Sequence, residues 1–174
     1  MKPYLWIGAH ARAAGCIALC TLALLLSSRD ARSATCSLSA TGAAFGAYLN
    51  VLNESAVATI SGTCSRGNGA DPDMTAATVS LSPGTSASYT TRQMAQGVNR
   101  LNYNLYTSAA RAVIWGNGTG GTATVAGLAV QGNGRFLNVN SSRNFSLSAY
   151  GRIPADQFVA LGSYSDTITV TITY

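Results

Sequence analysis

The sequence predicts an all-β protein built from many short strands. Polar and apolar residues alternate in many short segments of the chain, as they do along a strand with one buried face. Turn-forming glycine, proline and asparagine residues separate these segments, and glycine alone occurs 18 times in 174 residues. Helical periodicity is almost absent. Short strands divided in this way are typical of a β-sandwich or a β-barrel.

The first 33 residues have the features of a signal peptide. A positively charged start precedes an apolar stretch, Cys16–Leu26, and small residues follow at Ala31 and Ser33, as at a cleavage site for export. The apolar stretch is shorter than the about 20 residues that span a membrane as a helix. An uncleaved anchor is the competing interpretation. We therefore expect a signal peptide over residues 1–33 and one mature domain over residues 34–174.

Removal of this leader restricts the chemistry of the protein. The single histidine, His10, is lost, and seven arginines and five acidic residues remain, which gives a net charge of +2. Catalysis by a serine–histidine–aspartate triad is then impossible, and no set of metal ligands stands out. The arginines are scattered, as expected of solvated surface residues, whereas nucleic-acid binding needs a clustered basic surface. We expect no enzymatic activity, no catalytic residue, no metal, no cofactor, no nucleic acid and no small-molecule substrate.

Two cysteines remain in the mature chain, Cys36 and Cys64. An even number of cysteines in an exported protein predicts a disulfide, and two free thiols are the alternative. The chain-entropy model gives a bridge across a loop of this length roughly 3–4 kcal/mol of stability.

The expected strands follow one another along the mature chain with glycine-rich turns between them, two of which are 66–69 and 132–134. The strands are 35–40, 56–64, 77–82, 101–106, 112–115, 122–130, 145–150 and 166–174. No composition shift or linker suggests a second domain.

The final segment, 166–174, has the clearest alternation. Ile168, Val170, Ile172 and Tyr174 fall on one face, and threonines occupy the other. β-Branched residues favour strands. We expect the apolar face to lie in the core or in a groove that binds a partner strand.

A glycine-rich segment, 116–121, reads as the tip of a hairpin. Trp115 ends the preceding strand, and Asn117 lies within the tip. Both are candidates for an exposed tip that contacts a ligand, although for Trp115 we favour packing in the core.

Several motifs in consistent order resemble those of the spore coat protein U domain family, which includes pilins of archaic chaperone–usher pili. They are Ala34-Thr35-Cys36-Ser37-Leu38-Ser39, Phe45-Gly46-Ala47-Tyr48, Gly62-Thr63-Cys64, Leu101-Asn102-Tyr103-Asn104-Leu105-Tyr106, Trp115-Gly116-Asn117-Gly118, Tyr150-Gly151-Arg152-Ile153-Pro154 and the last 13 residues from Gly162 to Tyr174.

This resemblance implies an immunoglobulin-like, pilin-type β-sandwich that lacks one strand. It implies export to the periplasm and then to the cell surface or a pilus. The implied partners are a periplasmic pilus chaperone, an outer-membrane usher and sibling pilin subunits. The implied function is that of a structural subunit, assembled by donor-strand complementation, that supports adhesion and biofilm formation.

The sequence departs from a polymerising pilin at its mature N-terminus. The expected cleavage leaves only Ala34 and Thr35 before Cys36, whereas a donor strand needs about ten residues. We therefore expect a subunit that accepts a strand without donating one, as a terminal subunit would. The alternative is a secreted adhesin or coat protein that binds a surface or a glycan through exposed loops without polymerising.

Overall fold

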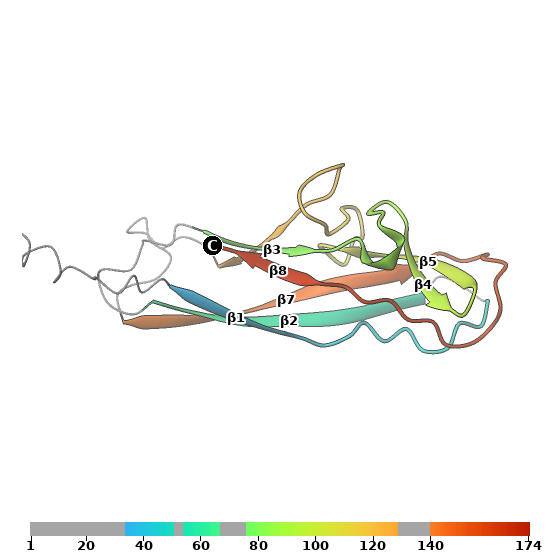
Figure 1. Cartoon of the computed structure of the whole chain (residues 1–174), viewed down its shortest axis with the longest axis horizontal. Helices are drawn as coiled ribbons and strands as arrows, with labels where there is room; N and C mark the ends of the chain where they lie inside the picture. The colour runs from blue at the N-terminus through green and yellow to red at the C-terminus, as the bar shows by residue number, and fades with distance from the viewer. Residues whose placement is uncertain (1–33, 51–53, 67–75, 129–139) are drawn as a thin grey trace, which may run out of the picture. The chain divides into compact units, whose positions relative to one another are not determined.

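Two antiparallel sheets form the protein, and they lie face to face (Figure 1). The five-stranded sheet has the order β1 (Thr35–Ala40), β2 (Glu54–Arg66), β7 (Ser141–Ile153), β5 (Asn99–Tyr106), β4 (Arg92–Gln96). The three-stranded sheet has the order β6 (Val125–Leu128), β3 (Ala77–Leu81), β8 (Val170–Thr173). A short 3₁₀ turn, η1 (Gly84–Ser86), follows β3. The prediction of an all-β protein is confirmed.

The computed structural model describes residues 34–50, 54–66, 76–128 and 140–174. These residues belong to one compact unit, Arg32–Tyr174. Within these ranges, no helix is long and apolar enough to cross a bilayer. The expected signal peptide lies outside the described residues, as do the turns at 67–69 and 132–134, so its cleavage stays a prediction.

The core lies between the two sheets and is built from alternate residues of each strand. In β3, for example, Ala77, Val79 and Leu81 are buried, and the residues between them are partly exposed. They face Ile60 of β2 and Leu105 of β5 in one hydrophobic cluster. A strand has this pattern because successive side chains point to opposite faces of the sheet.

The longest pairing in the protein joins β2 to β7 in an unbroken register from Glu54↔Ile153 to Arg66↔Ser141. Within it Gly62 has a structural role, because an added Cβ would collide with the ring of Phe145. A glycine at this position lets the phenylalanine lie flat against the neighbouring strand. The β2–β7 pair is therefore the rigid base on which the edge strands are placed.

The sequence predicted most strands correctly, but it placed one strand wrongly, missed another and made the last one too long. The segment 112–115 forms no strand, and only the isolated bridges Tyr106↔Ile114 and Trp115↔Ala123 occur there. The strand β4 (Arg92–Gln96) was not predicted, because its inward residues are Arg92 and Met94 and lack an apolar alternation. The predicted strand 166–174 is real but shorter, since β8 spans Val170–Thr173.

Candidate functional site

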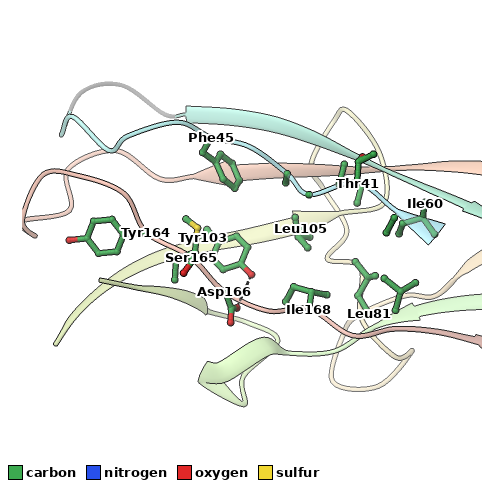
Figure 2. A pocket seen from close by; sticks show the side chains of 17 residues that line it. Thr41, Phe45, Ile60, Leu81, Tyr103, Leu105, Tyr164, Ser165, Asp166 and Ile168 are labelled. Carbon is green, nitrogen blue, oxygen red and sulfur yellow. Dashed lines mark hydrogen bonds between the residues drawn. The ribbon is translucent and has the colours of Figure 1, made fainter. Parts of the chain in front are cut away.

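A groove of about 380 Å³ lies between β1 and β8, at the edge where the two sheets approach each other. Figure 2 shows its side chains, most of which are apolar. The groove is lined by Ala40, Thr41, Gly42, Ala43, Phe45, Ala58, Ile60, Leu81, Met94, Tyr103, Leu105, Ala149, Tyr164, Ser165, Asp166, Ile168 and Val170.

One wall of the groove is the free edge of β8. In the three-stranded sheet, β8 is paired with β3 on one side only. The Ser82 amide donates to the Thr169 carbonyl at 2.9 Å, so the main chain of Thr169 faces β3. Because successive residues of a strand direct their amides and carbonyls to opposite edges, those of Ile168 and Val170 face the groove.

The other wall is the free edge of β1 and the segment that follows it. The Thr41 amide donates to the Thr59 carbonyl of β2 at 2.9 Å, so by the same alternation the main chain of Ala40 and Gly42 faces the groove. Residues 42–47 belong to no strand or bridge of the described structure. Two strand edges with backbone groups available for pairing thus face each other across an apolar floor.

The groove is closed at one end by main-chain pairing. The Tyr48 amide donates to the Gly162 carbonyl at 2.8 Å, and the Gly162 amide donates back at 3.1 Å. Three residues later, Ser165 exchanges a similar pair of hydrogen bonds with Ala95 of β4, at 2.8 and 3.1 Å. Both edges of the groove are therefore anchored at this end.

Three side chains cross the groove near the closed end. The Tyr103 hydroxyl donates to Asp166 Oδ2 at 2.8 Å, and the Tyr103 ring meets Phe45 edge-on, with centroids 6.1 Å apart. Figure 2 shows Phe45 and Asp166 on either side of Tyr103. The side chain of Tyr103 links the two walls and holds them at a fixed separation.

Asp166 accepts further hydrogen bonds that fix its position. Its Oδ1 atom accepts from the Thr85 amide at 3.0 Å, the Thr85 hydroxyl at 2.9 Å and the Thr167 amide at 2.8 Å. Burial and the hydrogen bond to Asp166 raise the pKa of Tyr103 well above its usual value. The tyrosine therefore remains a neutral donor at physiological pH. Asp166 was not among the site residues expected from the sequence.

Arg92 is fully buried, which corrects the expectation that the arginines are solvated surface residues. Its guanidinium donates to the Ser82 carbonyl at 2.8 Å, to the Trp115 carbonyl at 2.7 Å and to Asn104 Oδ1 at 2.7 Å. Burial lowers the pKa of Arg92, but arginine stays charged in proteins. The cation fastens β3, β4 and β5 to the segment around Trp115 behind the groove.

The four residues of the predicted apolar face of the last strand differ in their surroundings. Ile168 and Val170 line the groove. Ile172 is half-buried against the core, and Tyr174 is exposed. The first two thus lie where a partner strand would make contact, and their role in binding stays a prediction.

Trp115 forms no part of an exposed tip. Its side chain is fully buried, and its indole nitrogen donates to the Val79 carbonyl at 2.9 Å. Packing in the core, the favoured interpretation, is the arrangement found. Asn117 is exposed in the glycine-rich turn, where its Oδ1 accepts from the Thr119 hydroxyl at 2.7 Å. The two residues therefore do not form one exposed tip.

The predicted disulfide is present. Cys36 and Cys64 are opposite each other in the β1–β2 register, and their sulfur atoms are bonded. The bridge ties β1, the edge strand of the groove, to its neighbour β2. No group of three or more histidine, cysteine, aspartate or glutamate residues that could hold a metal occurs in the described part of the chain.

Sequence reasoning missed a second exposed apolar surface at the closed end of the groove. Val98 is 92% exposed and Phe158 is 94% exposed, and Leu49 and Leu161 are also largely exposed. The Tyr48↔Gly162 bridge sets Leu49 opposite Leu161, and the Ala95↔Ser165 bridge brings the β4–β5 turn beside the same segment. We call Leu49, Val98, Phe158 and Leu161 the apolar end.

The sequence matches the Spore Coat Protein U domain family over residues 21–171. The chain belongs to this family. No curated protein sequence matches this Spore Coat Protein U domain protein. The family assignment agrees with the motifs that suggested it from the sequence.

Among solved structures, this Spore Coat Protein U domain protein is similar to a chain in the pre-assembly complex of the chaperone CsuC and the tip adhesion subunit CsuE, from archaic chaperone-usher Csu pili of Acinetobacter baumannii. The TM-score is 0.50 and the identity is 21%, over 81% of this chain and 40% of that chain. The likeness shows the fold, a pilin-like β-sandwich, as predicted. The chain spans less than half the length of the protein chain it matches.

Proposed function

We propose that this protein is an exported structural subunit of a surface fibre and that it accepts a β-strand from a partner. The observation that carries the proposal is the pair of strand edges, β1 and β8, that face each other across an apolar groove. An extended segment placed there pairs its backbone with both edges and buries alternate side chains. A strand donated head to tail by a related subunit joins the two subunits in a filament.

Energetics favour occupation of the groove. Ile168, Val170 and Ile172 are only partly buried in the isolated chain, and burying an aliphatic side chain fully contributes about 1.5–3 kcal/mol. An inserted strand adds its own inward side chains to this gain. A domain of this size is stable by only about 5–15 kcal/mol, so strand insertion changes its stability substantially.

The partners follow from the same groove. A periplasmic chaperone would supply a temporary strand. During assembly at an outer-membrane usher, a strand from a sibling subunit would replace the chaperone's strand. The chaperone–subunit complex of the similar structure supports this proposal. Export to the periplasm and then to the cell surface follows from it, and the terminal position in a fibre depends on the predicted cleavage after residue 33.

The test is an appended strand. A flexible turn and a nine-residue strand of alternating valine and threonine are added after Tyr174, so that the strand can fold back along β8. We expect the exported protein to gain several degrees in melting temperature. The matched control carries aspartate at each inward position and gains nothing. Equal melting of the two proteins and the unextended chain would show that the groove accepts no strand.

A second candidate function is adhesion to apolar surfaces, and the apolar end favours it. The three segments that carry these side chains, 46–50, 96–99 and 157–163, contain no charged residue. Contiguous exposed apolar residues on a monomer mark sites of interaction. This function is compatible with that of a subunit at the tip of a fibre, and it requires no strand donation.

Adhesion is tested by retention of the purified exported protein on octyl-agarose. The double substitution Val98→Ser and Phe158→Ser should reduce retention strongly. Val57→Ser is the matched control, because Val57 is 52% exposed on the outer face of β2, away from the apolar end. If the control loses as much retention as the double variant, the apolar end has no special role.

A further inference from the structure

The floor of the groove is recessed at one level by three adjacent small residues. Ala58 pairs with Ala149 across β2 and β7. The hydrogen bond from the Thr41 amide to the Thr59 carbonyl brings Gly42 beside Ala58. All three line the groove, and we call them the notch. An added Cβ at Gly42 would meet no atom within 4 Å, so there is open space beside Gly42.

The floor is higher on both sides of the notch. Toward the open end, Ile60 is paired with Ala40, and the larger Ile60 side chain raises the floor of the groove there. Toward the closed end, Phe45 covers Gly151 so closely that an added Cβ there would lie 2.5 Å from its Cζ atom. The Phe45 ring then meets Tyr103, whose hydroxyl reaches Asp166. The Phe45–Tyr103–Asp166 level is therefore already filled by the protein itself.

Along the groove, the distance from the notch to the Phe45–Tyr103–Asp166 contact is the distance between two successive inward residues of a strand. Ala58 and Ala56 are successive inward residues of β2, and Ala56 is paired with Gly151, beneath Phe45. A strand rises about 3.3 Å per residue, so alternate side chains are about 6.6 Å apart. Successive inward side chains of an inserted strand would consequently meet the notch and then the filled level.

We infer that the strand accepted by this groove carries a bulky apolar residue over the notch and a small residue at the next inward position. The inference rests on the proposed function and names the kind of partner strand. A large side chain beside Phe45 and Tyr103 overpacks the groove, and a small one over the notch leaves a cavity. The notch residues and Tyr103 thus select the strand by size.

The test uses labelled synthetic peptides and the purified exported chain, with binding followed by fluorescence anisotropy. Two peptides carry the mixed pattern in opposite orders, Val-Thr-Phe-Thr-Ala-Thr-Val and Val-Thr-Ala-Thr-Phe-Thr-Val, because the strand can enter in either direction. Two others carry phenylalanine or alanine at both central inward positions. We expect one mixed peptide to bind about tenfold more tightly than either uniform peptide, as a size mismatch of one side chain predicts.

Filling the notch should reverse this preference. In Gly42→Val the added side chain enters the empty space, so the alanine peptide should bind more tightly than the mixed one. Ala58→Leu fills the notch from the floor and provides a second variant if Gly42→Val folds poorly. Ser61→Leu, on the outer face of β2, is the matched control and should keep the wild-type order. Equal binding of all four peptides overturns the inference but leaves the proposed function standing, whereas binding of none overturns both.

Discussion

Tyr48 and Gly162 exchange two main-chain hydrogen bonds, at 2.8 and 3.1 Å, and the two edges of the groove separate from this pair. The segments that contain them are far apart in sequence and run antiparallel. The contact between Tyr48 and Gly162 closes the groove at one end. It also fixes Leu49 and Leu161 side by side in the apolar end.

Substitution of Gly162 should weaken this contact. Gly162 has a φ of +131°, and an added Cβ would lie 2.5 Å from Gln96 Nε2. We expect Gly162→Val to lower the free energy of unfolding by about 1–3 kcal/mol, because a strained backbone conformation costs about that much. Urea denaturation measures it. Gly42→Ala is the control, since a Cβ there meets nothing within 4 Å, and an equal loss in both variants would contradict this account.

Tyr103 should make the protein less stable in alkali. Its pKa is raised in the folded state by burial and by Asp166, whereas an unfolded tyrosine titrates near pH 10. The contribution of the neutral Tyr103 hydroxyl to the free energy of unfolding is therefore complete below pH 10, and it is lost as the pH rises above that value. Tyr103→Phe removes this part of the pH dependence. Melting curves between pH 8 and 11 that are parallel for the two proteins would contradict the role of Tyr103.

A charge on the apolar wall of the groove should prevent accumulation of the protein in the periplasm. Val170→Asp places a carboxylate among apolar groups, where it lacks a partner, and Ile172→Asp should act in the same way. Thr171→Asp is the matched control, because Thr171 is exposed on the opposite face of β8. Immunoblots of periplasmic extracts measure the yield. An unchanged yield of Val170→Asp counts against burial of this face in the assembled protein.

Loss of the disulfide should destabilise the edge strand of the groove. Cys64→Ser is expected to lower the free energy of unfolding by about 2–5 kcal/mol, as removal of a native bridge does in small exported domains. The wild-type protein treated with reductant should fall to the same stability. Identical melting of the wild type with and without reductant would argue against a structural role for the bridge.

Regular alternation made much of the fold predictable. The strand 35–40 was predicted with its observed bounds, and the Ile168–Val170 face was found because threonine and aliphatic residues alternate strictly there. The disulfide followed from the count of cysteines. These features depend on local pattern or composition, which a single sequence contains.

The features that escaped prediction depend on contacts between distant segments. Arg92 cannot be told from a surface arginine without its acceptors, the Ser82 and Trp115 carbonyls. The acceptor of the Trp115 indole, the Val79 carbonyl of β3, likewise comes from a distant segment. The wall formed by residues 42–47 has no strand pattern. The groove itself arises from two chain edges that only the folded structure brings together.

The free edge of β8 is the central claim, and amide hydrogen exchange tests it most directly. By residue-resolved NMR, the amides of Ile168, Val170 and Ile172 should exchange rapidly in the exported chain and become protected when the valine–threonine strand is appended after Tyr174. The Thr169 amide, which donates to Ser82 Oγ at 2.9 Å, should change less. Amides of Ile168 and Val170 that are already protected in the unextended chain, and that the added strand leaves unchanged, would contradict the account.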